Sequence, residues 1–462
     1  MSIVIARSPA KAKGYGDLTA SVLGGGKERV GEQRINLLVH LNQERRRSMK
    51  NRILKRAYLW FVVACLCFGG LLALSSAVHA QETLKIACIT ALTGVVGPIG
   101  QSQLAGAKVA EMHINEEGGI LGKKILIIER DDAASPATAV KVVRELAMNE
   151  KIKFFVGGVS SAEALAVSAL MEQLDSLYFV VAAGTPKLTG VNCNPHVFRL
   201  GINSVAQHRS IAKLVLEKYP NLKKWANISP DYEYGHQCYQ AFSSELKRLN
   251  PGVTFVESVW PKFMAKTFEP EILKILQAKP EAVFSSLYSG DFITFVKQAK
   301  KYKFFDDLKA LFNPSIEIDV AQVLGHEMVN CWGGNHYYYE AFDNPVNKRF
   351  IAGHKKLYGT FPIYASGEGY SAMYALKYAI EKAKTFETKP LIFALRGMIF
   401  ESPNGKRIIR PEDHQGIKTD VSLHFVPTKE PPGWKIDEVK VISEEPFIPK
   451  LEEPDGGCKM KW

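Results

Sequence analysis

The chain has 462 residues, of which 46% are hydrophobic, 10% aromatic and 23% charged. These ordinary globular proportions exclude a disordered chain, a collagen-like fibre, a single-lobe miniprotein and a multi-span membrane protein. The formal net charge is +12, which would suit a nucleic-acid or anionic-membrane partner if it were spread over the whole chain.

The excess charge lies at the N-terminal end. Residues 1–80 hold 13 basic and four acidic side chains, so the rest of the chain carries only about +3. We therefore expect no nucleic-acid partner.

Residues 49–80 have the three-part form of a secretory signal. A basic start precedes an uncharged apolar run over 59–74, and small or modest side chains at Val78 and Ala80 precede polar Gln81. We predict cleavage after Ala80 and export. The alternative is an uncleaved membrane anchor, since the uncharged stretch approaches spanning length. Residues 1–48 precede a complete signal, so we interpret them as a disordered extension or a mis-assigned start.

Seven cysteines are present, and five of them follow the signal segment. Their spacings fit no metal site. Export would permit a disulfide, for which we consider a pair among Cys193, Cys238 and Cys331. Cys88 lies in an apolar strand pattern and Cys458 in a polar tail, which argues against both.

From residue 84, short apolar runs alternate with helical patterns, which indicates βαβ units and a parallel sheet. We predict strands at 84–90, 124–129, 154–159 and 178–183, with helices at 102–116, after the capping pair Ser135-Pro136, and at 162–174.

The same rhythm restarts after residue 200 and indicates a second lobe. Strands are predicted near 225–228, 253–259, 282–287 and 309–312, with helices between them. Residues 336–398 read as mostly helical, with a helix at 368–384 that we expect to complete the first lobe. The segment 430–462 is rich in Pro, Glu and Lys and is expected to be irregular.

Two α/β lobes would form a ligand cleft between the carboxyl ends of their sheets. Within this pattern lie the motifs ITALTG (89–94), GGILGK (118–123), Asp131-Asp132, FVGGVSS (155–161), PHVFR (195–199), PDYEYG (230–235) and RPEDHQ (410–415). Their order over residues 84–430 resembles the branched-chain amino acid (Leu/Ile/Val-type) periplasmic substrate-binding proteins of ABC transporters.

The resemblance implies a type I periplasmic binding protein fold, in which two doubly wound α/β lobes are joined by a hinge with three crossovers. It places lobe I at 81–203 and 335–423, lobe II at 204–334 and 424–450, and a tail at 451–462.

The resemblance also assigns polar contacts on the first lobe. Ser161, with Ser160 beside it, together with Ala183 and Thr185, would hold the carboxylate and ammonium of the ligand. Hydroxyls and helix N-terminal N–H groups can hold an anion without a full positive charge. The alternative is that Ser160 only caps a helix and Thr185 only ends a strand.

On the second lobe the resemblance assigns aromatic contacts to Tyr288 and Tyr234, with Tyr232 as a third. Their rings would cover an apolar ligand body while their hydroxyls reach its polar end. Ordinary packing is the alternative for each.

One position departs from the family pattern. Where amino-acid binders carry an acid for the ammonium, this chain has Ser315, and a hydroxyl cannot neutralise a buried ammonium. Glu317, Glu233 or Asp291 could substitute. Otherwise the ligand is an aromatic or aliphatic carboxylate without an α-amino group, or a neutral amide. A family tyrosine is replaced by Ile99, which makes that wall more apolar.

Two further motifs attract attention. Asp413-His414-Gln415 has no nucleophile or third metal ligand at a matching spacing, so we interpret it as a structural turn. The run from His336 to Tyr339 could stack on bases, but its place between the lobes favours a hinge or a cleft wall.

The resemblance thus leads us to expect a non-enzymatic periplasmic solute-binding protein of an ABC importer, with no cofactor and no metal. Its expected partners are a small molecule (amino acid, aromatic or aliphatic carboxylate, or amide) and an ABC permease in the inner membrane. The alternatives are a ligand-sensing receptor module of the same fold and an enzyme that uses the cleft.

Overall fold

The computed structural model describes residues 44–47, 49–50, 52, 57–62, 83–334, 336–453 and 456–460. The chain divides into two units, Met1–Ala80 and Gln81–Trp462, and each is described by itself. The described residues of the first unit are helical, whereas most of the predicted extension (1–48) and signal (49–80), with the cleavage position at Ala80, lies outside the described residues. Across the described part of the chain, no helix is long and apolar enough to cross a membrane.

The second unit opens with a five-stranded sheet, which we call, with its covering helices, lobe I. In spatial order its strands are β2 (Lys124–Asp131), β1 (Thr83–Thr90), β3 (Phe154–Gly157), β4 (Leu177–Val180) and β5 (Val197–Arg199). All neighbouring strands are parallel. The strands β3 and β4 are buried along their whole length, which explains their continuous apolar sequences.

Helices cover both faces of this sheet. Alternate side chains of β1 point to opposite sides and therefore belong to two separate cores. Ile86 and Cys88 belong to one core with α2 (Gly97–Glu116) and α11 (Tyr364–Ala383). Ala87 and Ile89 belong to another core with α3 (Pro136–Asn149) and α4 (Ser161–Ser168). The further helices α10 (Pro345–Tyr358) and α12 (Thr388–Leu395) also add side chains to the first core.

Helix α2 begins five residues before the predicted start at residue 102. Pro98 stands in its first turn, where proline is tolerated. Gly100 lets this turn approach the chain after β1, because a Cβ at this position would lie 1.8 Å from the carbonyl oxygen of Ala91. This close approach brings α2 to the carboxyl end of β1.

A seven-stranded sheet, with its helices, forms the second half of the unit, which we call lobe II. In spatial order its strands are β15 (Trp434–Ser443), β14 (Thr419–Pro427), β10 (Cys331–Gly333), β9 (Ala310–Asn313), β8 (Ala282–Ser285), β6 (Lys224–Ile228) and β7 (Thr254–Val259). The last five of these strands are mutually parallel, whereas β14 runs antiparallel to both of its neighbours, β10 and β15.

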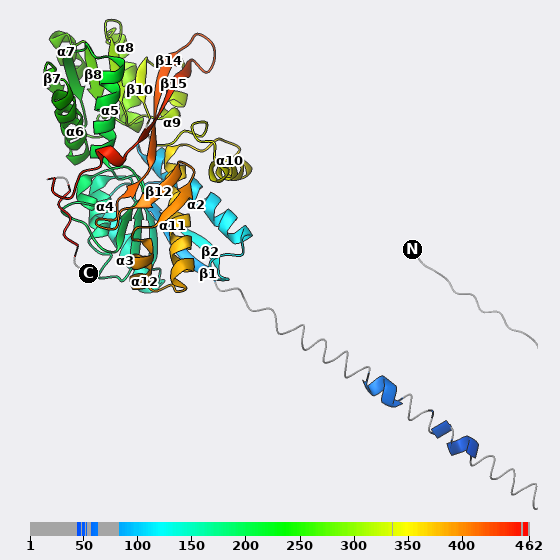
Figure 1. Ribbon diagram of the computed structural model, residues 1–462. Helices are drawn as coiled ribbons and strands as arrows, with labels where there is room; N and C mark the ends of the chain where they lie inside the picture. Colours follow the sequence, from blue (N-terminus) through cyan, green and yellow to red (C-terminus); the bar gives the residue numbers. More distant parts are fainter. Residues whose placement is uncertain are drawn as a thin grey trace, which may run out of the picture. The chain divides into compact units, whose positions relative to one another are not determined.

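The sheet of lobe II is also covered on both faces (Figure 1). One core includes side chains of α5 (Ser204–Lys218) and α6 (Glu233–Leu249), and the other those of α7 (Glu269–Ala278), α8 (Ser289–Lys301) and α9 (Ile318–Leu324). The remaining elements are the small antiparallel sheet β11 (Ile399–Ser402), β12 (Gly405–Ile409) and β13 (Gly416–Ile417), and the 3₁₀ turns η2 (Pro186–Leu188), η3 (Gly325–Glu327) and η4 (Glu445–Phe447).

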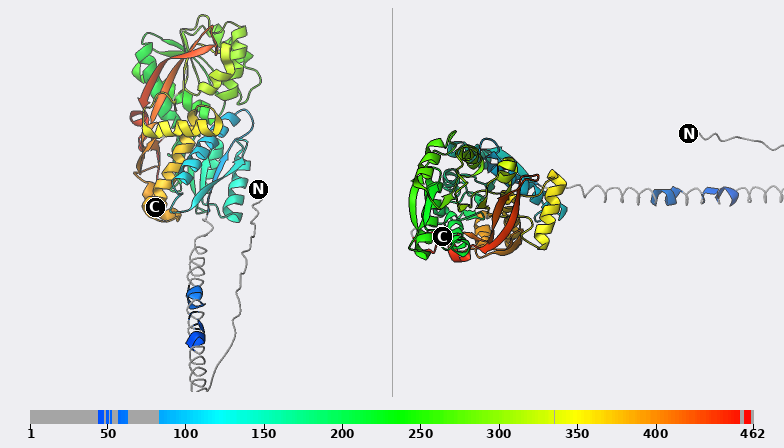
Figure 2. Two further views of the ribbon diagram at one scale, coloured as in Figure 1. Left: turned by 90° about the vertical axis from the view of Figure 1, so that its right-hand side faces the viewer. Right: turned by 90° about the horizontal axis from the view of Figure 1, so that it is seen from above.

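Three crossovers connect the two lobes, as the resemblance implies. The chain passes from β5 to α5, from β10 to α10, and from β13 to β14. The lobes are stacked end to end around these passages (Figure 2). This is a type I periplasmic binding protein fold with two doubly wound α/β lobes.

The predictions for the chain after residue 420 need two corrections. The predicted lobe boundary at 423/424 falls inside β14, so residues 419–423 pair in the sheet of lobe II. The segment expected to be irregular contains the ten-residue strand β15, whose side chains alternate between partly buried and exposed. The alternation from Trp434 to Ser443 is a strand signal that the content of Pro, Glu and Lys obscured.

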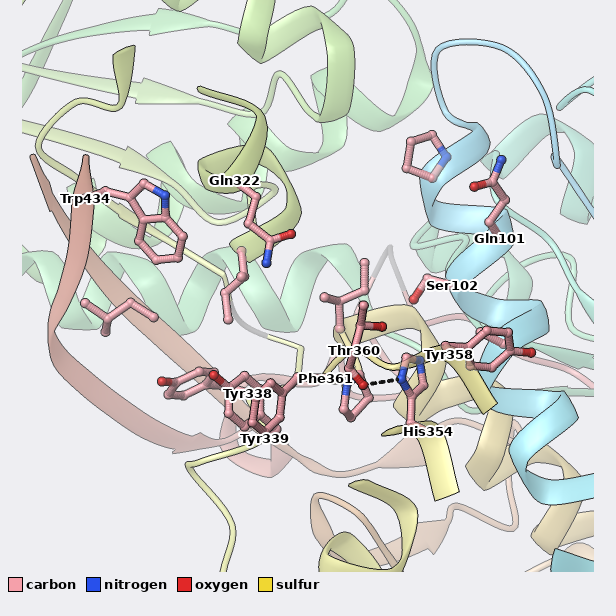
Figure 3. Close-up of a pocket in the computed structure, with 16 residues that line it drawn as sticks. Gln101, Ser102, Gln322, Tyr338, Tyr339, His354, Tyr358, Thr360, Phe361 and Trp434 are labelled. Carbon is pink, nitrogen blue, oxygen red and sulfur yellow. Dashed lines mark hydrogen bonds between the residues drawn. The ribbon is translucent and has the colours of Figure 1, made fainter. Parts of the chain in front are cut away.

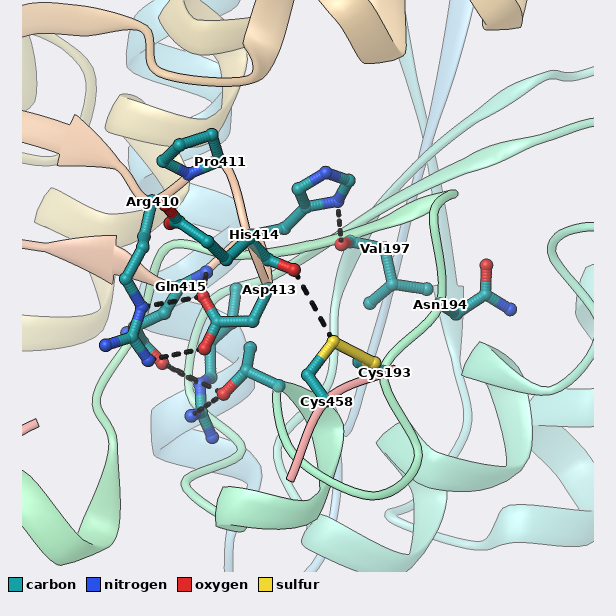
Figure 4. Close-up of a disulfide and its surroundings, with 12 residues drawn as sticks. Cys193, Asn194, Val197, Arg410, Pro411, Asp413, His414, Gln415 and Cys458 are labelled. Carbon is teal, nitrogen blue, oxygen red and sulfur yellow. Dashed lines mark hydrogen bonds and ion pairs between the residues drawn. A yellow bond between two sulfur atoms is a disulfide. The ribbon is translucent and has the colours of Figure 1, made fainter. Parts of the chain in front are cut away.

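The disulfide prediction was wrong. Cys193 is bonded to Cys458, with Cα atoms 5.6 Å apart, whereas Cys88, Cys238 and Cys331 are buried free thiols (Figure 4). After β15 the chain returns to lobe I, where the Pro449 carbonyl accepts hydrogen bonds from Arg410. The polar tail is folded back over lobe I, and this brings Cys458 to Cys193.

The Asp413-His414-Gln415 segment is a buried turn in lobe I. Asp413 binds Arg410, and Gln415 accepts a hydrogen bond of 2.7 Å from Arg199 Nε. The His414 ring stacks on Phe198 with centroids 4.1 Å apart. These contacts account for all three side chains in structural terms.

Candidate functional site

A small cavity lies between the lobes, where the carboxyl ends of their parallel strands face each other. Its volume is about 50 Å³. Its wall is built from loops after β3, β4, β8 and β9, from the starts of α2, α6 and α11, and from two interlobe passages. The carboxyl edge of parallel strands is where ligands dock in such sheets.

The start of α4 forms the polar part of the lobe I wall. Ser160 caps the helix: its hydroxyl accepts the Glu163 N–H at 3.2 Å, while the Glu163 carboxylate accepts the Ser160 N–H. Ser161 lines the cavity. The Ser161 hydroxyl, and the N–H groups of Ser161 and Ala162, make no hydrogen bond with the described residues. These are the orphan donors expected in a first helical turn.

The chain after β4 presents different residues from those expected. Ala182 and Gly184 line the cavity, while the predicted Ala183 and Thr185 are buried beside it. Thr185 donates a hydrogen bond to Glu233 of lobe II at 3.2 Å and accepts one from the Lys187 N–H. Successive side chains of an extended segment point in opposite directions, so an error of one residue in the predicted position replaces the cavity-facing residues with their buried neighbours.

Three tyrosines form most of the lobe II wall, at the positions predicted. The hydroxyls of Tyr232 and Tyr288 lie 2.8 Å apart, and that of Tyr234 lies 2.7 Å from Ser315 Oγ. All four residues line the cavity. Burial raises the pKa of each of the three phenols. They are therefore neutral hydrogen-bonding groups at physiological pH.

The hinge side of the cavity carries His336 and Tyr364. Their ring centroids lie 4.0 Å apart. His336 lies in a stretch predicted as hinge or cleft wall, whereas Tyr364 was missed because the helix was predicted to start at residue 368 instead of Tyr364. Pro362, two residues before Tyr364, is a start signal that would have corrected this.

Glu317 lies behind His336 and does not line the cavity. Its Oε1 is 3.8 Å from His336 Nε2. Burial raises the pKa of Glu317 well above its usual value, and nearby Asp319 adds to the shift. Burial also lowers the pKa of His336 well below its usual value, and Lys418 adds to this. We therefore describe the pair as two neutral groups.

The other acids considered for an ammonium are engaged elsewhere. Glu233 binds Lys187 at 2.7 Å as well as Thr185. Asp291 accepts the Met264 N–H at 2.9 Å, and burial raises its pKa to about 6. The remaining lining residues are Ile99, Val159 and Ile202. The cavity wall thus consists of hydroxyls, one imidazole and apolar groups.

A larger groove of about 770 Å³ lies at the side of the lobes (Figure 3). It is lined by α2, α9, β15 and the segment between α10 and α11, with Tyr338, Tyr339 and Trp434 among its aromatic side chains. Size alone would favour it as the ligand site. Most of its lining comes from helices, β15 and the hinge passage, however, and it contains none of the predicted site residues, so we place the candidate site in the smaller cavity.

Within the described residues, no group of three or more His, Cys, Asp or Glu side chains could hold a metal ion.

Comparisons with known proteins place the fold in a family. The model of the family described as "Periplasmic binding protein" matches residues 83–423. The Leu/Ile/Val-binding protein of Escherichia coli (strain K12) is 28% identical over 233 residues, which are 50% of this chain and 62% of that protein. The match therefore spans about three fifths of that relative. Leu/Ile/Val-binding protein homolog 4 of Brucella melitensis is 26% identical over 377 residues, covering 78% of this chain and 87% of the relative.

Solved structures give the same result for the fold. An amino acid ABC transporter substrate-binding protein from Pseudomonas fluorescens Pf-5 superposes with a TM-score of 0.72 at 19% identity, covering 82% of this chain and 99% of that one. A solute-binding protein from Rhodopseudomonas palustris BisB5, in complex with 3,4-dihydroxybenzoic acid, has a TM-score of 0.69 at 24% identity, covering 78% and 98%. A solute-binding protein from R. palustris in complex with benzoate has a TM-score of 0.71 at 19% identity, covering 82% and 100%. The match of the family model over most of the chain is decisive: this chain belongs to the periplasmic binding protein family.

Proposed function

We propose that this protein is the periplasmic substrate-binding component of an ABC importer, and that its ligand is a small carboxylate without an α-ammonium group. It captures the ligand between its lobes and delivers it to a membrane permease. The reaction is binding and release, and the protein is not an enzyme.

The composition of the cavity wall carries this proposal. None of its twelve lining residues bears a formal charge. An anion can still be held there, because Ser161 and the orphan N–H groups at the start of α4 supply hydrogen-bond donors and the positive end of a helix dipole.

An ammonium group has no counterpart in this wall. Ser315 occupies the position of the family's acid, and its hydroxyl already bonds Tyr234. Glu233 is paired with Lys187, and neither Glu317 nor Asp291 reaches the cavity. Burying an ammonium without a carboxylate costs several kcal/mol, about enough to exclude an amino acid in favour of its desamino analogue.

The lobes are closed on each other in this structure. Glu233 of lobe II binds Thr185 and Lys187 of lobe I, and Ser289 of lobe II donates a hydrogen bond of 2.8 Å to the Val95 carbonyl. The closed cavity of about 50 Å³ is far below the size of typical ligand pockets, roughly 300–1,000 Å³. Ligand access therefore requires the lobes to separate about the hinge, which is the motion expected of a capture protein.

Two of the structurally similar proteins are described in complex with benzoate and with 3,4-dihydroxybenzoic acid. Their likeness concerns the fold, and it is consistent with a carboxylate between such lobes. The signal-like segment before residue 81 supports export to the periplasm.

A direct test pairs each amino acid with its desamino analogue. We would denature the purified protein to release any bound molecule, identify that molecule by mass spectrometry, and measure thermal shifts with leucine against 4-methylvalerate and with benzoate. A bound carboxylate raises the melting temperature by mass action. We expect shifts with the carboxylates and none with leucine.

Tighter binding of leucine than of 4-methylvalerate would overturn the ligand class. Chemical turnover of the bound molecule would overturn the transport role, whereas recovery of the ligand unchanged supports it. Tyr288→Ala should weaken binding, since its ring and hydroxyl both form the wall.

A further inference from the structure

His336 has an unusual environment for a residue on the cavity wall. It is the one side chain with a basic nitrogen among the lining residues, and it is almost completely buried. Its Nδ1 is shielded from solvent and makes no hydrogen bond with the described residues. Buried polar atoms are nearly always paired, so an unpaired nitrogen beside a ligand cavity points to a missing partner.

The neighbours of the other ring nitrogen determine where the proton lies. Gln207 Nε2 donates to the Pro314 carbonyl at 3.1 Å, which fixes the orientation of the Gln207 amide. The same Nε2 lies 3.4 Å from His336 Nε2. An amide NH₂ can only donate, so His336 Nε2 is the acceptor. Since a neutral imidazole carries one proton, that proton is on Nδ1.

The Nδ1 edge of the ring is the one without a protein partner. His336 lines the cavity, whereas Gln207 and Glu317, the two groups beside Nε2, do not. The Nδ1–H of this cavity-lining residue is therefore a donor without an acceptor among the described residues.

We infer that His336 determines the specificity of the cleft by donating its Nδ1–H to a second oxygen of the ligand, at the end away from the carboxylate. This inference rests on the proposed function and names its substrate class more closely. The ligand is a small carboxylate that carries a distal hydroxyl group.

The positions of the two polar ends support a distal oxygen. The carboxylate donors lie at the start of α4, after β3 of lobe I, whereas His336 follows β10 of lobe II and stacks on Tyr364. Tyr364 also lines the cavity, and its hydroxyl makes no hydrogen bond with the described residues. A ligand hydroxyl satisfies both groups, because it can accept from Nδ1–H and donate to Tyr364.

The test compares matched ligands on matched variants. The probes are 4-hydroxybenzoate against benzoate, and 5-hydroxyvalerate against valerate, measured by isothermal titration calorimetry on the full protein. His336→Phe keeps an aromatic ring against Tyr364 but removes the donor. His336→Asn keeps an N–H donor near the position of Nδ1.

We expect the native protein to bind the hydroxylated member of a pair at least about tenfold more tightly. His336→Phe should bring this ratio close to one by weakening the hydroxylated member alone, and His336→Asn should recover most of it. The unsubstituted member serves as the control for folding within each variant.

Three results would overturn the inference. An unchanged ratio in His336→Phe would exclude the hydrogen bond to the distal oxygen. Equal weakening of both members would place His336 on the carboxylate or in the support of the fold. If leucine binds and no carboxylate of either pair does, the proposed function fails together with this inference. If both members of a pair bind the native protein with equal affinity, the inference alone is overturned.

Discussion

The ligand cavity and the hinge are both buried, yet they are built from different chemistry. The cavity wall holds hydroxyls and a neutral imidazole. The hinge holds five buried residues with ionisable side chains, which we call the hinge cluster: Glu368, Arg407, Lys418, Asp420 and Glu444. Lys418 stands at the crossover between β13 and β14, so the cluster joins the two lobes.

Ion pairs link the members of the hinge cluster, and burial together with the neighbouring Glu444 carboxylate raises the pKa of Asp420 well above its usual value. Arg407 binds Glu368 at 2.6 Å, and Lys418 contacts Asp420, with Glu368 at 3.6 Å and Glu444 at 3.9 Å. Burial opposes the charge on Lys418, but the surrounding carboxylates raise its pKa. The comparison shows that ionisable side chains are buried at the hinge, where oppositely charged side chains surround them. The cavity wall contains no such side chain, so a charged group in the cavity would belong to the ligand.

Removing Lys418, one of the two cations of the hinge cluster, should have the largest effect. Lys418→Met leaves Asp420 and Glu444 without their cation, and we expect the free energy of unfolding to fall by about 3–5 kcal/mol in urea denaturation. Lys435→Met, on an exposed position of β15, is the matched control and should change it by less than about 0.5 kcal/mol. Equal effects of the two would show that the cluster contributes nothing to stability.

The second prediction concerns the disulfide that ties the C-terminal tail to lobe I. The disulfide between Cys193 and Cys458 closes a loop with a sequence separation of 265. Cys458→Ser should lower the free energy of unfolding by about 2–4 kcal/mol. Reductant should bring the native protein to the level of the variant and leave the variant unchanged. A native protein that is insensitive to reductant would contradict this.

Asp291 provides an intermediate case, because it is a buried acid that forms no ion pair within the described residues. Burial raises its pKa to about 6 from 3.8, so the folded state binds its proton more tightly than the unfolded state. The protonated Asp291 carboxyl therefore contributes to the free energy of unfolding below about pH 4, and this contribution is lost as the pH rises through about 6.

Asp291→Asn should therefore stabilise the protein by about 1–3 kcal/mol at pH 7.5 and have little effect at pH 4. Asp307→Asn, on an exposed residue, controls for the change in net charge. A stability gain that does not depend on pH would mean that the carboxyl of Asp291 is not the titrating group.

The smallest effect on stability is expected in the cavity. The Ser161 hydroxyl makes no hydrogen bond with the described residues, so Ser161→Ala should leave the free energy of unfolding within about 0.5 kcal/mol of the native value. The same change should weaken carboxylate binding about tenfold, as measured by calorimetry. Ser160→Ala should instead cost about 1 kcal/mol of stability, because Ser160 caps α4. Reversed results would exchange the roles of the two serines.

Much of this architecture could be predicted from local sequence. The strands from β1 to β9, with the exception of β5, which was not predicted, lie within a few residues of their predicted positions, since buried parallel strands appear as apolar runs. The tyrosines and Ser315 were predicted from motifs that follow those strands, and the structure brings them to one cavity.

The exceptions are long-range. Ala183 and Thr185 missed the cavity by one residue, because the direction of a side chain depends on where the strand ends. Tyr364 and Ile202 come from distant segments that meet the cavity only after the lobes dock.

The sequence by itself determined the alternation of strands and helices, the repeat of that alternation in two lobes and the low charge after residue 80, because periodicity and composition are local properties. Only the tertiary structure decided which hydroxyls face the cavity, that Cys458 reaches Cys193, that β15 joins the sheet of lobe II, and that Nδ1 of His336 carries the proton. Each of these depends on contacts between residues far apart in the chain, for which no local pattern selects the partner.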